Sequence, residues 1–277
     1  MHSVIFRQLI IIVITLSYFS ISEAKTYALV ADGLIDGKAN NVLQDKAVIV
    51  TGNQITAIIN IDHIPKDAVK IELPGTTLMP GMINAHEHPL LYKSDYQNAH
   101  LQASSAYKAL LGLKNLQRLL RAGWTTIRVM GDGDVYYANQ DIRKVIDSGV
   151  FIGPRLTGAA HYISITGGGG DINYFSPEQT VIADGLIADG PDEIRKAIRK
   201  EIKYGSDWIK IMVTGAFMSV GDNPRNVSFS PQELAAAVEE ASRHNIPVAA
   251  HAHATEGINQ AIIAGARSIE HGSYLDE

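Results

Sequence analysis

Two pairs of histidines in this sequence share the spacing His-x-His, and each pair ends an apolar run. The first pair is His86 and His88, and the second is His251 and His253. Because side chains on a strand alternate between its two faces, both members of a pair point the same way, at the separation that two ligands of one metal ion need. A single such pair is more often a surface feature or a pair of satisfied core histidines, so the surrounding residues decide its meaning.

Lys210 lies in the middle of the nearly apolar run 207–213, which predicts a buried parallel strand. Burying an ammonium group is costly unless the group is paired or neutralised. One explanation is chemical, because a neutral lysine can add carbon dioxide and the two oxygens of the resulting carbamate can bridge two cations. A lysine that forms a salt bridge, or that extends to the rim of the sheet, explains this run equally well.

A further histidine, His271, ends the short predicted strand 268–271. Like the His-x-His pairs, it stands where a strand gives way to a loop. Taken singly, it would more often be a structural histidine. Histidine and lysine sites at the same end of successive strands are instead typical of a shared metal centre.

Six strand-like runs, with helical segments between most of them, position these residues. The runs lie near residues 78–84, 125–130, 155–160, 208–213, 248–252 and 268–271. Strand, helix and strand in this order predict parallel crossovers. Helices are expected over 105–122, 191–204 and 231–244, the last opened by a capping box at Ser230 and Glu233. The fold class is therefore α/β, and six strands are two short of a closed (β/α)8 barrel.

The set of motifs resembles the amidohydrolase superfamily, and within it the branch that contains imidazolonepropionase and the metal-dependent Xaa-Pro dipeptidases. The resemblance runs from about residue 27 to the last residue. The matching segments are 80–88, 208–211, 246–251 and 268–272. It implies an incomplete TIM (β/α)8 barrel over 78–277 and part of a small N-terminal β-sandwich over 25–77.

The resemblance also implies a binuclear metal centre. The first-strand pair, His86 and His88, would hold one divalent ion. His251 and His271 would hold the second ion, and a carbamylated Lys210 would bridge the two. Zinc is the default metal for such histidine-rich ligation. This leaves His253 as a substrate-facing residue or a support for a ligand.

Members of this superfamily carry a further ligand, an aspartate at the end of an eighth strand, which also shuttles a proton. Here the sixth strand-like run is followed closely by Glu277. We therefore expect a chain truncated at its C-terminus, with the catalytic aspartate beyond its end. Residues 78–277 are also fewer than the roughly 250 of a complete barrel.

A glycine-rich loop over 164–171 follows the third predicted strand. Consecutive glycines let backbone amides approach a ligand closely, although a flexible lid would use the same residues. The loop resembles the superfamily's Thr-Gly-Gly-His-Gly-Asp segment, with Gly169 where many members have histidine. We assign Gly168 and Gly169, together with His253, to substrate binding, and we expect His161 to be a structural histidine.

The first 24 residues predict a signal peptide. Arg7 precedes the apolar run 9–16, and small residues precede a cleavage site after Ala24. Because the apolar run is short for a membrane span, no stable membrane anchor is expected. The chain has no cysteine, so a lipid anchor on cysteine is excluded as well. The protein is therefore expected to be exported, either to the periplasm or to the medium.

The composition fits a globular enzyme, with 46% hydrophobic residues, a net charge of −5 and no basic patch that would indicate nucleic-acid binding. The resemblance predicts hydrolysis of an amide C–N bond in a dipeptide or another small molecule, by an exported dipeptidase that could form homo-oligomers. Two alternatives stay open. One is an imidazolonepropionase-like hydrolase of cyclic amides, for which Lys210 would not be required. The other is an inactive remnant that lacks the eighth-strand aspartate.

Overall fold

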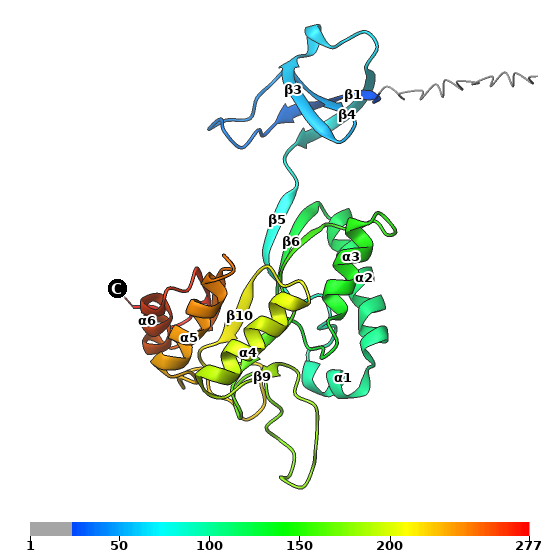
Figure 1. Cartoon of the computed structure of the whole chain (residues 1–277). Helices are drawn as coiled ribbons and strands as arrows, with labels where there is room; N and C mark the ends of the chain where they lie inside the picture. Colours follow the sequence, from blue (N-terminus) through cyan, green and yellow to red (C-terminus); the bar gives the residue numbers. More distant parts are fainter. Residues whose placement is uncertain (1–23, 277) are drawn as a thin grey trace, which may run out of the picture. The chain divides into compact units, whose positions relative to one another are not determined.

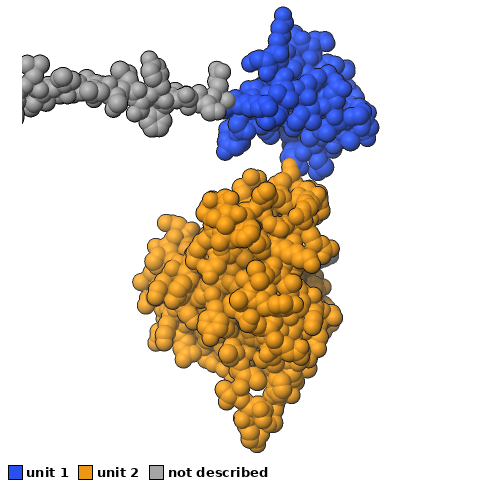
Figure 2. All heavy atoms as spheres, turned by 90° about the vertical axis from the view of Figure 1, so that its right-hand side faces the viewer, with its two compact units in different colours: residues 1–80 blue, residues 81–277 orange. Residues whose placement is uncertain are grey.

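The computed structural model describes residues 24–276, so nearly all of the predicted signal peptide lies outside the described residues. The chain divides into two compact units after Pro80, close to the domain boundary expected after residue 77 (Figure 2). No helix among the described residues is long and apolar enough to cross a membrane.

In the first unit, residues 24–80 form a four-stranded sheet. Its strands are β1 (Thr26–Leu34), β2 (Lys46–Thr51), β3 (Gln54–Asn60) and β4 (Val69–Leu78), in the order β3-β2-β1-β4. β2 pairs antiparallel with both β1 and β3, whereas β4 pairs parallel with β1. A short 3-10 turn, η1 (Ile61–His63), follows β3. Small and branched apolar side chains, among them Ala28, Ala47 and Ile49, form the buried core of this unit.

The second unit alternates strands and helices, and all its strand pairings are parallel, which confirms the α/β class. Its strands are β5 (Met82–Glu87), β6 (Trp124–Met130), β7 (Arg155–Ala159), β8 (Tyr162–Ser164), β9 (Leu186–Ile187), β10 (Ile209–Met212), β11 (Val248–Ala252) and β12 (Ser268–His271). They form two sheets, β5-β6-β7 and β12-β11-β10-β8-β9. The two sheets meet where the chain passes from β7 to β8.

Six helices accompany these strands (Figure 1). They are α1 (Tyr96–Gln102), α2 (Ser105–Arg121), α3 (Ala138–Asp147), α4 (Gly190–Lys203), α5 (Pro231–Ser242) and α6 (Thr255–Ala264). The predicted capping box opens α5, because the Ser230 hydroxyl accepts from the Glu233 amide and the Glu233 carboxylate accepts from the Ser230 amide. At the C-terminal end of α2, Gly123 takes the left-handed φ of +94° that stops the helix before β6.

β10 and β11 lie in the interior of this unit. Every residue of both strands is buried, as expected for parallel strands that are covered on both faces. Ile209 and Ile211 belong to an apolar core that also includes residues of α4, α5 and α6. Lys210 stands between them with 1% of its surface exposed, and it points to the opposite side.

Candidate metal centre

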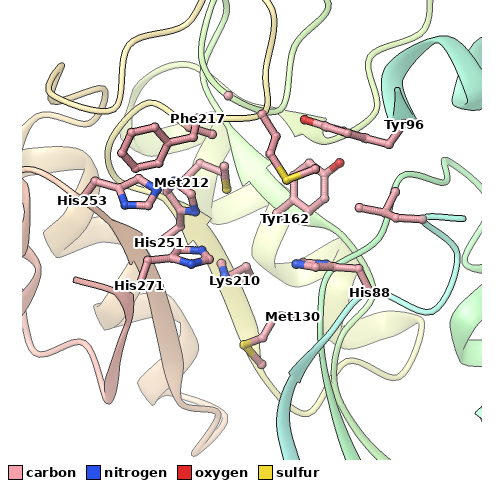
Figure 3. A pocket seen from close by; sticks show the side chains of 14 residues that line it. His88, Tyr96, Met130, Tyr162, Lys210, Met212, Phe217, His251, His253 and His271 are labelled. Carbon is pink, nitrogen blue, oxygen red and sulfur yellow. The ribbon is translucent and has the colours of Figure 1, made fainter. Parts of the chain in front are cut away.

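The carboxyl ends of β10, β11 and β12 border a cavity of about 220 Å³, and Figure 3 shows the side chains that line it. Its lining residues are His88, Leu91, Tyr96, Met130, Tyr162, Gly169, Lys210, Met212, Ala216, Phe217, Met218, His251, His253 and His271. Histidine and lysine nitrogens therefore meet in a hollow that is otherwise mainly apolar. Such a setting strengthens any interaction with a charged or polarised group.

His86 and His88 bring their Nε2 atoms to within 3.2 Å of each other at the end of β5. The Nδ1 of His86 lies 2.6 Å from a carboxylate oxygen of Glu270, and the Nδ1 of His88 lies 2.5 Å from the carbonyl oxygen of Gly131. Because both acceptors take a proton from Nδ1, the neutral form of each ring presents its Nε2 lone pair to the other ring. Two ligands of one tetrahedral zinc ion are about 3.3 Å apart, so this pair fits a metal ion.

A second group of nitrogens lies at the ends of β11 and β12. One ring nitrogen from each of His251, His253 and His271 lies within 4.8 Å of the others, close enough to hold a metal ion. The Nε2 of His251 donates to the carbonyl oxygen of Gly215 at 3.1 Å, which leaves its Nδ1 free for a ligand. His253, interpreted from the sequence as substrate-facing, therefore also stands where a metal ligand could stand.

The two groups are continuous. The ring centres of His86 and His271 are 4.9 Å apart, and those of His271 and His251 are 4.5 Å apart. All five histidines singled out from the sequence thus lie together. Figure 3 shows Lys210 between His88 on one side and His251 and His271 on the other.

Burial disfavours the charged form of His88, His251 and His271, and the neutral form is the one that binds metals. Burial, followed by the charge of Lys210, lowers the pKa of His88 to about 3 and that of His271 to about 4. The same two causes bring the pKa of His251 well below its ordinary value. A site that disfavours protons on several neighbouring rings favours a metal cation that those rings can coordinate.

Burial also lowers the pKa of Lys210 to about 7, although the nearby carboxylate of Glu270 opposes the shift. That carboxylate is engaged elsewhere, at 2.8 Å from Arg128 and 2.6 Å from His86. The salt bridge considered from the sequence is thus not formed with Glu270. A lysine with such a pKa is neutral in a large fraction of molecules near pH 7, which is the form that reacts with carbon dioxide.

The chain bends sharply at the end of β12. His271 has a φ of +74°, a left-handed conformation that residues other than glycine rarely adopt. Strained backbone of this kind is concentrated at functional sites. The bend accompanies an unusual arrangement, in which the consecutive residues Glu270 and His271 both contact the ring of His86.

The glycine-rich loop lies over one side of the cavity. Gly169 lines it, and its carbonyl oxygen accepts from the Ser219 hydroxyl at 2.5 Å. A β-carbon at Gly169 would lie 3.0 Å from both the Met212 methyl group and an Asp222 oxygen, so little room remains for a side chain. Gly168 is not among the lining residues, and its amide donates to the carbonyl oxygen of Ile165 at 3.0 Å.

His161 lies apart from the cavity in a satisfied pair with Glu201. The ring Nδ1 is 2.7 Å from one carboxylate oxygen, and the His161 amide donates to the other oxygen at 3.0 Å. Both residues are buried. These contacts tie the β7–β8 connection to α4, in line with the structural role expected for His161.

Reasoning from the sequence missed two polar groups beside the cavity. One is Glu270, whose signal was a carboxylate directly before His271 in the short strand β12. The other is Asp184, which accepts from the Tyr162 hydroxyl and, at 3.1 Å, from the side-chain amide of Gln97. Burial raises the pKa of Asp184 to about 6. Asp184 lies on an irregular segment, so no strand or helix pattern indicated its position.

Parallel strands with converging histidines at their carboxyl ends and a buried lysine among them place the chain in the α/β class, in an arrangement typical of metal sites. Residues 77–277 match the Amidohydrolase family, and the chain belongs to this family. The resemblance stated from the sequence is thereby confirmed.

Two relatives illustrate the match. Ochratoxinase from Aspergillus niger is 32% identical over 278 residues, which cover 93% of this chain and 56% of ochratoxinase. Its crystal structure aligns with a TM-score of 0.78 over 92% of this chain and 62% of that one. The crystal structure of a Xaa-Pro dipeptidase with methionine bound in its active site aligns with a TM-score of 0.80 at 32% identity, over 91% of this chain and 63% of the dipeptidase. The chain thus spans about 56% of the length of the curated relatives it matches.

Proposed function

We propose that this chain carries the metal site of an amide hydrolase that acts on dipeptides or other small amides. The observation that carries the proposal is the meeting of four histidines and a buried lysine around one cavity, with a fifth histidine, His86, beside His88 and His271. The family membership and the likeness to ochratoxinase and a Xaa-Pro dipeptidase support it. The buried Lys210 favours a dipeptidase over an imidazolonepropionase-like enzyme, in which that lysine would not be required.

The donor set suits two divalent ions, with zinc as the default. His86 and His88 would hold one ion. His251 and His271 would hold the other, with His253 as a further candidate ligand, and Lys210 would bridge them as a carbamate. When bound, such ions act as Lewis acids that lower the pKa of water and polarise a carbonyl oxygen.

The chain's own residues have three tasks in this proposal. Hydrogen bonds from the Nδ1 atoms of His86 and His88 hold both rings in the tautomer that binds a metal. Burial supplies Lys210 in the neutral form that can become a carbamate. Apolar side chains such as Met212 and Phe217 exclude water and offer contact to an uncharged substrate side chain.

The proposal extends to the rest of the protein. The parallel strands of the second unit would belong to a (β/α)8 barrel, and the sheet of the first unit would belong to a small β-sandwich. Export would follow from the first 24 residues. Edman sequencing of the protein from its native host tests the export step, because cleavage after Ala24 would make Lys25 the first residue.

The main test measures metal content and hydrolysis together. The full chain is purified with Zn²⁺ and bicarbonate, metal per chain is measured, and hydrolysis of dipeptides with apolar or charged side chains is followed. We expect His88→Ala to lose metal and to lower the rate at least about 100-fold, since it removes a ligand rather than a supporting group. His244→Ala is the matched control, because His244 is exposed near the end of α5.

Two results would contradict the proposal. One is a metal content that neither His88→Ala nor Lys210→Ala changes. The other is a protein isolated from the native host that is loaded with two metal ions and hydrolyses none of the amides.

A further inference from the structure

Glu270 lies at the centre of a hydrogen-bonded group that connects β12 to β5 and β6. Its side chain is buried, with 6% of the residue exposed. One carboxylate oxygen, Oε2, lies 2.6 Å from Nδ1 of His86. The other, Oε1, accepts from Arg128 at 2.8 Å and from the Ser268 hydroxyl at 2.7 Å. Each oxygen therefore has its own partners.

Arg128 is held in place independently of Glu270. Its Nε donates to the carbonyl oxygen of Ala85 at 2.7 Å, and its guanidinium group lies over the Trp208 ring at 4.5 Å. A guanidinium fixed by a backbone carbonyl and an aromatic face cannot swing to follow the carboxylate. Arg128 and Ser268 thus hold Oε1, and this leaves Oε2 directed at His86.

We propose that Glu270 is a positioning residue for the metal site: its carboxylate fixes the His86 ring in the tautomer whose Nε2 lone pair faces Nε2 of His88. This inference rests on the proposed metal site. Neutralising Arg128 would need only Oε1, whereas the contact with His86 uses Oε2. A carboxylate behind a metal-binding histidine orients the ring and makes its other nitrogen more basic.

The carboxylate stays charged in this position. Burial alone would raise the pKa of Glu270, but hydrogen bonds from His86 and Ser268 and the charges of Lys210 and Arg128 lower it to about 2. The donors around the carboxylate hold it as an acceptor, and His86 directs Nδ1 at Oε2.

The test replaces this acceptor with a group of the same size. In Glu270→Gln, the amide oxygen is expected to stay with Arg128, because a guanidinium can only donate, and Ser268 can donate to the same oxygen. The amide nitrogen then faces Nδ1 of His86 as a donor, so the ring must move its proton to Nε2 and can no longer bind a metal there. We expect zinc affinity, measured by competition with a chelator on the full chain, to fall 10- to 100-fold.

Glu240→Gln is the matched control. Glu240 is also a buried glutamate, with 2% exposed, and it pairs with an arginine, Arg199, at 2.6 Å. It lies on α5 and contacts none of the site histidines. Removing this ion pair reproduces the general cost of losing a buried glutamate, and zinc affinity should stay within about twofold of the wild-type value.

A second measurement does not depend on metal. Nitrogen-15 NMR of the metal-free chain reports which nitrogen of each histidine carries the proton. We expect the proton of His86 on Nδ1 in the wild type and on Nε2 in Glu270→Gln, with no change in Glu240→Gln. Should Glu270→Gln fail to fold, Glu270→Asp keeps the charge but withdraws it from His86, and it should weaken zinc binding at least threefold.

The outcomes separate this inference from the proposed function. If zinc binds the wild type, depends on His88, and is unaffected by Glu270→Gln with His86 unchanged in tautomer, the positioning role is wrong and the metal site stands. If the wild type binds no zinc, or His88→Ala binds it equally well, the proposed site fails and the role of Glu270 fails with it.

Discussion

The second unit buries two lysines, Lys108 and Lys210, and each lies beside histidine. Lys108 on α2 is 3% exposed and Lys210 on β10 is 1% exposed. By burial and by neighbouring residue type the two are nearly alike. They differ in what their ammonium groups contact.

Lys108 has a complete set of partners. Its ammonium donates to Nδ1 of His100 at 3.0 Å and to the carbonyl oxygen of Gly133 at 2.8 Å, and the Asp134 carboxylate lies 3.4 Å away. His100 in turn directs Nε2 at the carbonyl oxygen of Ile182 at 3.1 Å. Asp134 Oδ1 accepts no hydrogen bond and has Lys108 as its ion-pair partner, and the cluster connects α1, α2 and the loop after β6.

Among the described residues, Lys210 has no comparable set of hydrogen-bond and ion-pair partners. Its surroundings are neutral histidine rings with lowered pKa values, and the nearby acid, Glu270, is paired with Arg128 and His86. The comparison shows that burial beside histidine does not make a lysine functional. A buried lysine whose ammonium group has hydrogen-bond acceptors and a carboxylate nearby is structural. A buried lysine surrounded by histidine nitrogens is available to react.

The largest expected effect in this comparison is the loss of stability in Lys108→Met. The substitution keeps the volume but leaves the buried Asp134 carboxylate without its cation. Removing one partner of a buried pair costs about 3–5 kcal/mol. Urea unfolding should show this decrease in the free energy of unfolding, with zinc content per folded chain unchanged. A decrease below about 1 kcal/mol would show that the backbone and hydroxyl donors to Asp134 suffice.

A smaller effect is expected for the pH dependence of stability in His100→Gln. Burial, followed by the charge of Lys108, lowers the pKa of His100 in the folded chain. The unfolded chain therefore takes up this proton first, and His100 reduces wild-type stability as the pH falls below about 6.5. Glutamine can still accept from Lys108 and donate to Ile182, but it does not titrate.

Urea unfolding of both proteins between pH 7.5 and 5 measures this difference. The wild type should lose more stability than His100→Gln as the pH falls through this range. Parallel curves for the two proteins would mean that His100 is not held neutral by the Lys108 cluster.

The sequence pattern predicts the burial of Lys210 but not that of Lys108. Lys210 interrupts a short apolar run, so its burial was predictable from local pattern. Lys108 lies on a helix where lysines are normally solvated, and its burial depends on Asp134, 26 residues further along the chain. Local pattern cannot show a partner that only the folded chain brings near.

Helices and strands were likewise predictable where local sequence pattern determines them, and not where distant partners do. The start of α5 was predictable because Ser230 and Glu233 form a capping box within four consecutive residues. The strands β5 and β11 were predictable because an apolar run leads to the histidines of each. β8 and β9 were not, since these strands of three and two residues exist through pairing with neighbours. Glu270 was missed for a similar reason, because its role requires Arg128 from a distant strand.

The smallest expected change in stability is that of Lys210→Met. This substitution leaves no carboxylate unpaired, because Glu270 keeps Arg128 and His86. It also removes an amine whose charged form burial disfavours. We expect the free energy of unfolding of the metal-free chain to change by less than about 1 kcal/mol, or to rise. Urea unfolding in the presence of a chelator measures this value.

The same variant should differ most from wild type in metal binding, because Lys210 would bridge the two ions. We expect Lys210→Met to fold and to lose at least one of two bound zinc ions per chain. Lys108→Met should show the reverse, a weakened fold with its metal retained in the folded fraction. If Lys210→Met instead destabilised the metal-free chain by about 3 kcal/mol or more, Lys210 would be a structural lysine like Lys108, and the contrast between the two clusters would be wrong.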